Sequence, residues 1–151
     1  MIEAGGVSLF SMNYKNFINP SLAYAIVGAT QNHEKYGWVV FDNLRRKGLT
    51  VIPVNPKYDE IDGVKCYPDV MSLHDCPNVV VLVVPTDVGM HVLKQAGETG
   101  IKKVWCQPGA ESAEIVEAAA KYGIDIIAGG SCIMVATNGV KKSEVNQVTE
   151  S

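Results

Sequence analysis

The most constraining stretch of this sequence is an unbroken aliphatic run in the middle of the chain. It reads Val79-Val80-Val81-Leu82-Val83-Val84, with no polar residue at alternate positions. A strand of this kind has both faces covered, which is typical of a parallel sheet with helices packed on either side. The sequence around the run supports this interpretation, because short apolar segments alternate with segments of helical spacing.

This alternation predicts an α/β fold: a Rossmann-like, doubly wound, mostly parallel five-stranded sheet with helices on both faces. We expect strands at residues 22–28, 50–54, 79–84, 103–106 and 124–128, and helices at residues 37–47, 86–98 and 111–122. Thr86 or Asp87 is the expected N-cap of the second helix, and Ser112 suits the first turn of the third. Residues 69–73 are expected to form one short helical turn within a long irregular link.

The 151 residues suit a single domain, and no internal repeat or second domain is visible. We expect a loose N-terminal leader at residues 1–15, one domain at residues 16–140 and a polar tail at residues 141–151. A short helix or turn at residues 14–20 is expected to lead into the first strand. Ligands of such sheets bind beyond the carboxyl ends of the strands, near the point where the strand order reverses.

Composition and charge exclude several classes of function. The formal net charge is -3, and the longest basic stretch is Arg45-Arg46-Lys47, so we expect no nucleic-acid partner. No apolar run approaches the roughly 20 residues of a membrane helix, so no membrane partner is expected. Residues 1–19 lack the basic start and long apolar centre of a secretory signal. We therefore expect a cytoplasmic protein.

The residues that usually carry catalysis or bind metals form no recognisable constellation. Cysteines occur at positions 66, 76, 106 and 132, without a C-x-x-C pair or a histidine at zinc-ligand spacing, so we expect reduced structural thiols and no metal site. No G-x-S-x-G nucleophile motif occurs. His33, His74 and His91 are far apart in the sequence. His33 could donate to a phosphate from its loop, although a role at the loop surface is an equal alternative, and we predict no catalytic residue.

The first expected strand ends in a sequence suited to a phosphate. Ala23-Tyr24-Ala25-Ile26-Val27 is followed by Gly28-Ala29-Thr30, and a helix pattern begins at about Gly37. Glycine lets the backbone approach a ligand closely, and a helix N-terminus offers free N–H groups and a partial positive charge. This pattern favours a nucleotide-type ligand with a diphosphate.

NAD fits the details of this loop poorly. The G-x-G-x-x-G fingerprint is broken, because Thr30 and His33 stand at the second and third glycine positions. The second strand ends in Val54-Asn55-Pro56-Lys57, with no carboxylate for a ribose. Lys57 would instead favour a ligand with a ribose 3′-phosphate, although a solvated loop lysine has the same appearance. No G-x-x-x-x-G-K-[ST] motif occurs, so a P-loop is excluded.

Several motifs in order along the chain resemble one family. They are Ile26-Val27-Gly28-Ala29-Thr30, Val51-Ile52-Pro53-Val54-Asn55-Pro56-Lys57, Gly63-Val64-Lys65-Cys66-Tyr67-Pro68, Val83-Val84-Pro85, Trp105-Cys106-Gln107-Pro108-Gly109-Ala110-Glu111-Ser112 and Gly130-Ser131-Cys132-Ile133-Met134. The chain thereby resembles the small stand-alone CoA-binding proteins of bacteria and archaea. These are similar to the N-terminal CoA-binding domain of the succinyl-CoA synthetase alpha subunit.

The resemblance implies coenzyme A (CoA) as the ligand and a role for each matching residue. Gly28, Ala29 and Thr30 would line the diphosphate, and Val54, Asn55 and Lys57 would flank the adenosine and its 3′-phosphate. Val84 and Pro85 would form an apolar wall, unless they only pack at the strand end. Gln107 and Gly109 would border the pantetheine route, unless they only form the turn before the next helix. The negative charge of Glu34 would repel a polyphosphate unless the Glu34 side chain points away from it.

The resemblance does not extend to the ligase reaction, since the synthetase uses a phosphorylated histidine in a second domain that this chain lacks. We therefore expect a module that binds CoA or an acyl-CoA, non-catalytic and either regulatory or a carrier. A ligand-free interaction module and an NAD(P)-dependent oxidoreductase are the alternatives. A homo-oligomer or a protein partner is compatible with each.

Overall fold

A computed structural model describes residues 15–140 of the chain. The expected leader and tail lie almost wholly outside these described residues, so the proposed division into three parts stays a prediction. Residues 15–17 are helical, as expected for the segment that leads into the first strand.

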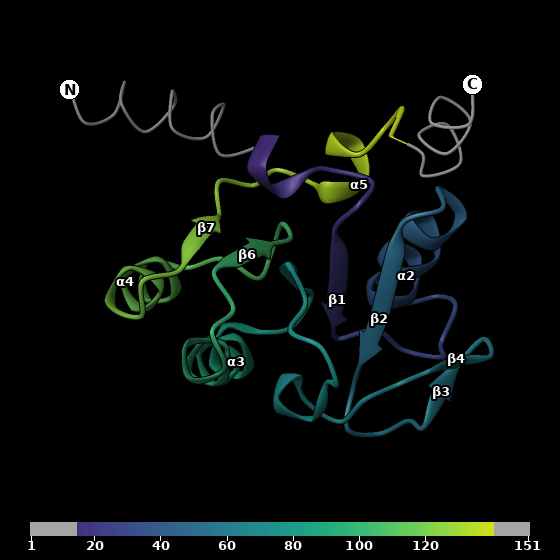
Figure 1. The fold of residues 1–151 in the computed structure, drawn as a ribbon, viewed down its shortest axis with the longest axis horizontal. Helices are drawn as coiled ribbons and strands as arrows, with labels where there is room; N and C mark the ends of the chain where they lie inside the picture. The colour runs from purple at the N-terminus through teal and green to yellow at the C-terminus, as the bar shows by residue number, and fades with distance from the viewer. Residues whose placement is uncertain (1–14, 141–151) are drawn as a thin grey trace.

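A five-stranded parallel sheet forms the centre of the molecule (Figure 1). Its strands are β1 (Ala23–Val27), β2 (Thr50–Val54), β5 (Val79–Leu82), β6 (Lys103–Cys106) and β7 (Asp125–Ile127). The order across the sheet is β2-β1-β5-β6-β7, and every pairing is parallel. The strand order reverses between β1 and β5, which is where a doubly wound sheet opens a crevice for a ligand.

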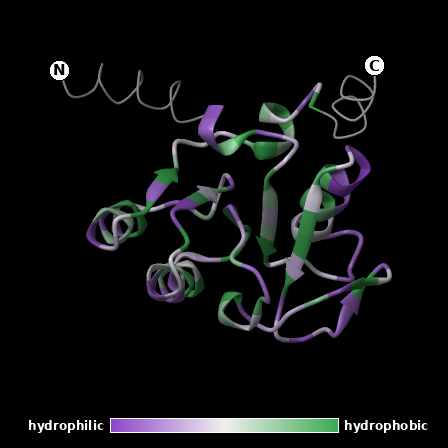
Figure 2. Ribbon diagram, viewed as in Figure 1, coloured by the Kyte–Doolittle hydropathy of each residue, from purple (hydrophilic) through white to green (hydrophobic). Residues whose placement is uncertain are grey.

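Helices cover both faces of the sheet, so the predicted fold class is confirmed. The helices are α2 (Tyr36–Arg46), α3 (Thr86–Thr99), α4 (Ala113–Lys121) and α5 (Ile133–Ala136), with a 3₁₀ turn at Val70–Ser72. Alternate residues of β5 explain the two layers: Val80 and Leu82 pack towards α3 and α4, whereas Val79 and Val81 pack towards α2 and α5. In Figure 2, α3 and α4 carry both polar and apolar residues round their circumference.

Three details differ from the sequence-based expectations. The aliphatic strand ends at Leu82, although the N–H of Val83 still donates to the carbonyl oxygen of Val27, and Val83 and Val84 are half-buried. The predicted cap of α3 was wrong: Pro85 occupies the N-cap position and no side chain caps the helix. Ser112 is the N-cap of α4, where its hydroxyl accepts a hydrogen bond from the N–H of Ile115.

The long link between β2 and β5 contains a small hairpin that the sequence analysis did not predict. It consists of β3 (Glu60–Ile61) and β4 (Val64–Lys65), joined by Asp62 and Gly63. In Figure 1 the arrowheads of β1 and β2 point towards the side of the molecule where this hairpin lies. The hairpin therefore stands beside the edge of the sheet where a ligand is expected.

Candidate functional site

A cleft of about 700 Å³ lies at the carboxyl ends of four strands. Its walls come from the segments that follow β1, β2, β5 and β6, and thus it spans the reversal point of the strand order. Most of the residues predicted to contact a ligand line it, namely Gly28, Thr30, Asn55, Lys57, Val84, Pro85 and Gly109. The topology therefore brings together positions that are spread over more than half of the sequence.

A second, smaller cavity of about 290 Å³ adjoins the first. The two share Gly28, Asn55 and Val84 in their walls. Val54 lines this smaller cavity, together with valines of β1, of the 3₁₀ turn and of α3. The mostly apolar lining suits a flat, weakly polar group next to the more polar main cleft.

Gly28 forms the floor of the main cleft through a conformation that only glycine adopts easily. Its φ angle is +105°, and a Cβ at this position would lie 2.3 Å from the carbonyl oxygen of Val83. A Cβ on Gly37 would lie 2.0 Å from the carbonyl oxygen of Gly28. Gly28 thus lets the end of β1 approach the segment after β5, and Gly37 lets the start of α2 approach the end of β1.

The N-terminus of α2 opens into this cleft without a side-chain cap. Lys35 occupies the N-cap position, where Ser, Thr, Asp or Asn is preferred, and makes no capping hydrogen bond. The first N–H groups of a helix have no intrahelical acceptor. Lys35 and Lys57 both line the cleft. Two cations and an uncapped helix N-terminus together favour an anion.

Thr30 and Asn55 connect the two sides of the cleft. The buried Thr30 hydroxyl lies 3.0 Å from the Tyr58 hydroxyl and accepts the N–H of Asn32. The Asn55 amide donates to the carbonyl oxygen of Ala29 at 2.8 Å, and its oxygen accepts the N–H of Lys57. Ala29 itself does not line the cleft, since its side chain is buried in the core.

Gln107 and Gly109 occupy different surroundings. Gln107 is fully buried behind the cleft wall, where it donates to the hydroxyl of Tyr36 at 2.7 Å and accepts the N–H of Ile133. Gly109 lines the cleft, but its N–H donates to the Glu111 carboxylate at 2.6 Å. The side chain of Gln107 thus supports the wall, while Pro108 and Gly109 form its surface.

A thiol stands next to this buried glutamine. Cys132 lies 3.4 Å from Nε2 of Gln107 and 3.6 Å from the Tyr36 hydroxyl. Burial disfavours its thiolate, but hydrogen bonds from Gln107, from Tyr36 and from backbone N–H groups outweigh this and lower the pKa of Cys132. Desolvation and the neighbouring thiol raise the pKa of Tyr36 to about 12, so Tyr36 keeps its proton and stays a donor. Burial raises the pKa of Cys106 to about 12, which fits a structural thiol.

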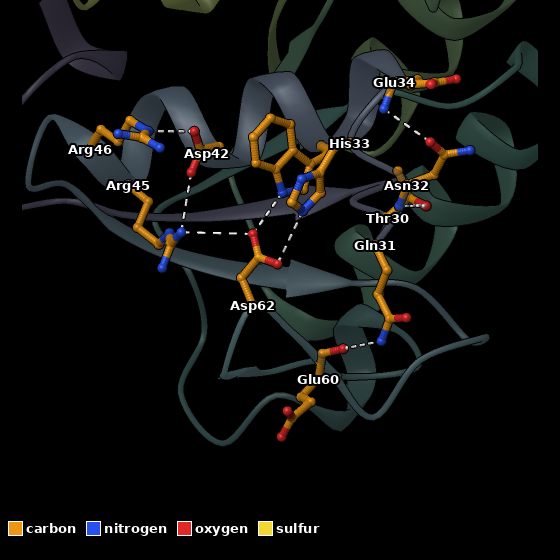
Figure 3. A network of polar contacts seen from close by, with 11 residues as sticks. Thr30, Gln31, Asn32, His33, Glu34, Asp42, Arg45, Arg46, Glu60 and Asp62 are labelled. Atoms are coloured by element: carbon orange, nitrogen blue, oxygen red, sulfur yellow. Dashed lines mark hydrogen bonds and ion pairs between the residues drawn. The ribbon is translucent and has the colours of Figure 1, made fainter.

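His33 and Glu34 are not among the residues that line the cleft. The His33 ring stacks on Trp38, with ring centroids 3.9 Å apart, and its Nε2 lies 3.3 Å from the Asp62 carboxylate (Figure 3). Glu34 is exposed, and its backbone N–H donates to the side chain of Asn32. Neither of the two side chains thus joins the walls of the cleft.

Lys35, Tyr36 and Tyr58 are lining residues that the sequence analysis did not identify. A signal existed for Lys35, because it directly precedes the helix that was predicted to face a phosphate. Tyr58 gave no signal, since its position opposite Thr30 depends on the path of the link after β2.

The CoA binding domain family matches residues 23–138. This chain belongs to that family. Among curated proteins, the chain is 33% identical to the ADP-forming acetate–CoA ligase of Methanocaldococcus jannaschii, over 86% of this chain and 19% of the ligase. It is 35% identical to the alpha subunit of the ADP-forming acetate–CoA ligase II of Pyrococcus furiosus, over 78% of this chain and 28% of the subunit. This CoA-binding domain chain thus spans less than a third of these curated relatives.

Two solved structures resemble this chain over most of their own length, unlike the ligases. A conserved hypothetical protein from Pyrococcus furiosus has a TM-score of 0.74 and 49% identity, over 77% of this chain and 99% of the other. A hypothetical protein from Pyrococcus horikoshii has a TM-score of 0.74 and 32% identity, over 85% and 87%. The matched region thus makes up most of these two hypothetical proteins but only a minor part of the ligases. Within residues 15–140, no helix is long and apolar enough to span a bilayer.

Proposed function

We propose that this chain binds coenzyme A or an acyl-CoA in the cleft at the carboxyl ends of its strands. It acts as a non-catalytic regulatory or carrier module of the cytoplasm. The observation that carries the proposal is the joint presence of Lys35, Lys57 and an uncapped helix N-terminus at the reversal point of the sheet. Membership of the CoA binding domain family and the CoA-using ligases among the relatives support the same ligand.

The parts of CoA correspond to the parts of the cleft. The diphosphate suits the turn at Gly28, Ala29 and Thr30, where backbone N–H groups and the Thr30 hydroxyl can donate to its oxygens. Lys57 is the counter-charge for the 3′-phosphate, and Val54 and Asn55 flank the adenosine beside the smaller apolar cavity. Lys35 is then left as the counter-charge for the diphosphate. A ligand with both a diphosphate and a 3′-phosphate thus uses both lysines.

The pantetheine arm suits the remaining walls. Val84 and Pro85 offer apolar contact, and Gly109 borders the route along which the arm leaves, with Gln107 as support behind this wall. We assign these walls to binding alone and propose no catalytic residue among them.

The decisive experiment compares two ligands on two proteins by calorimetric titration. CoA should bind wild-type protein about tenfold more tightly than dephospho-CoA, because Lys57 pairs with the 3′-phosphate. Lys57→Ala should weaken CoA binding and remove this difference between the two ligands. The matched control is Lys102→Ala, an exposed lysine at the opposite ends of the strands, which should preserve the tenfold ratio.

Three results would contradict the proposal. Absence of heat with millimolar CoA would exclude the ligand. Tight binding of NAD(P) with hydride transfer would favour an oxidoreductase instead. Unchanged behaviour of Lys57→Ala and Thr30→Val in every assay would favour an interaction module without a ligand in this cleft. Native mass spectrometry of protein purified without added ligand would report the mass of any retained nucleotide.

The proposed function includes assembly with further protein, as a homo-oligomer or with a separate partner. The long relatives support this, because in them the matched region is only 19% or 28% of a larger protein. The same mass spectra would give the number of copies in the assembly, and a strictly monomeric protein with no partner would contradict this part of the proposal.

A further inference from the structure

The two facing walls of the cleft belong to separate segments of the chain. One wall is the segment after β1, with Gly28, Thr30 and Lys35, and the other is the link after β2, with Asn55, Lys57 and Tyr58. A ligand that spans both walls binds well only when their spacing matches its length, because misplacement of either wall loses contacts. The question is therefore which groups hold the second wall in place.

The hairpin in the link is closed by a tight turn. Asp62 and Gly63 form its two-residue turn, with φ angles of +50° and +84°, as a type I′ turn requires. Asp-Gly is among the sequences that favour this turn, so the positive φ of Asp62 has a local explanation. The turn directs the carboxylate of Asp62 towards α2 (Figure 3).

The carboxylate of Asp62 contacts three side chains of the opposite wall and its helix. Its Oδ2 accepts the indole N–H of Trp38 at 2.7 Å, and its Oδ1 lies 3.3 Å from Nε2 of His33. The guanidinium of Arg45 lies 3.8 Å away. The hydrogen bond from Trp38, with smaller help from His33 and Arg45, lowers the pKa of Asp62, so the carboxylate is charged at neutral pH.

Three further contacts join the same two segments. The side-chain amide of Asn55 donates to the carbonyl oxygen of Ala29 at 2.8 Å. The side-chain amide of Gln31 donates to the carbonyl oxygen of Glu60 at 2.8 Å, and the hydroxyls of Thr30 and Tyr58 lie 3.0 Å apart. We call the contacts of Asp62 with His33, Trp38 and Arg45 the clasp. None of these four residues lines the cleft, so the clasp acts on a ligand only through the position of the walls.

We infer that Asp62 is a positioning residue, which acts with the direct contacts between the walls to set their spacing and thereby favours ligands long enough to contact both. The inference rests on the proposed function, since the spanning ligand is taken to be CoA. The affinity for a ligand that contacts one wall alone should not depend on the clasp.

Two substitutions separate the carboxylate from the turn that carries it. Asp62→Gly removes the clasp and keeps a turn sequence that favours positive φ. Asp62→Asn keeps an oxygen that can accept the Trp38 N–H, and asparagine also suits the turn. We expect Asp62→Gly to weaken CoA binding about tenfold and Asp62→Asn to restore most of this loss, as measured by calorimetry. Asp75→Gly, at an exposed aspartate in another part of the link, is the control and should bind CoA as the wild type does.

The discriminating readout is a ligand for one wall. Adenosine 3′-monophosphate has the 3′-phosphate but no diphosphate, so its affinity should be the same for the wild type and Asp62→Gly in ligand-observed NMR titration. Equal loss for both ligands, together with a lower unfolding temperature, would indicate general destabilisation and overturn the inference. Unchanged CoA affinity in Asp62→Gly would also overturn it while the proposed function stands. Failure of the wild type to bind CoA would instead overturn the proposed function, and the inference with it.

Discussion

Gly28 makes the approach of β1 to the segment after β5 possible, and its replacement should damage the whole fold. In Gly28→Ala, the new Cβ would meet the carbonyl oxygen of Val83 at 2.3 Å on a backbone with a φ angle of +105°. Backbone strain and overpacking of this kind cost about 3 kcal/mol together. We expect that loss in the free energy of unfolding, measured by urea denaturation.

Gly100→Ala is the matched control for this prediction. Gly100 has a similar φ angle of +88°, but a Cβ there would meet nothing within 4 Å. It should therefore cost only the left-handed backbone penalty of about 1–2 kcal/mol. Equal losses in the two variants would show that the contact with Val83 relaxes freely, and that the glycine is required only for its backbone angle.

Among the elements, the helices differ in how their N-termini are satisfied. Lys35 and Pro85, the N-cap residues of α2 and α3, line the cleft and provide no side-chain cap. Ser112, the N-cap of α4, does not line the cleft and does provide one. Of the three longer helices α2, α3 and α4, the two without a side-chain cap are thus those whose N-cap residues line the candidate site, where a bound anion could take over the role of the cap.

The cap of α4 gives an element-scale prediction. Ser112→Ala should lower the free energy of unfolding by about 1 kcal/mol, because the N–H of Ile115 loses its acceptor. Thr86→Ala should change it by less than about 0.5 kcal/mol, since Thr86 lies inside α3 and caps nothing. Chemical denaturation of both variants tests the pair. A larger loss in Thr86→Ala than in Ser112→Ala would contradict the assignment of the caps.

For the whole molecule, acid stability should depend on Asp42 of α2. Burial opposes ionisation of Asp42, but hydrogen bonds and charge interactions with Arg46 and Arg45 outweigh it and lower its pKa. A lowered folded-state pKa stabilises the protein above the unfolded value of about 3.9, and this stabilisation is lost as the pH falls towards the folded value. Asp42 therefore contributes at neutral pH, and its contribution falls as the pH drops below the unfolded value.

Asp42→Asn tests this pH dependence. The variant should be less stable than the wild type at pH 7, by about 1 kcal/mol for two partly exposed ion pairs. The difference should shrink as the pH falls below about 4, because the wild-type carboxyl is protonated in that range. Urea denaturation at several pH values measures the gap, and a constant gap from pH 7 to pH 2 would contradict the prediction.

Prediction from the sequence succeeded where a signal was local in the chain. The aliphatic run of β5 and the apolar spacing of α2 determine burial over a few consecutive residues, and those elements were predicted. The four-residue α5 and the two-residue strands β3 and β4 were not, because such short elements contain too few residues to display a period. The Asp62-Gly63 turn was a missed signal of the hairpin.

The residues of the candidate site likewise divide into those that local sequence signals identify and those that they do not. Gly28 and Lys57 were identifiable, because each follows a strand directly and parallel strands deliver their ends to one edge. The clasp was not identifiable, since Asp62 meets Trp38 only through the paths of two separate segments. Gln107 was expected beside a ligand and instead lies buried behind Tyr36, a distinction made by one side-chain orientation.

The sequence by itself determined the alternating α/β pattern, the family and the glycine-containing turn after the first strand, because these depend on hydrophobic spacing and backbone freedom within a few residues. Only the tertiary structure decided which helix ends stay uncapped, which side chains line the cleft and which hold its walls apart. Those outcomes depend on distances and orientations between segments up to about 80 residues apart, which are set when the sheet and its two helical layers pack together.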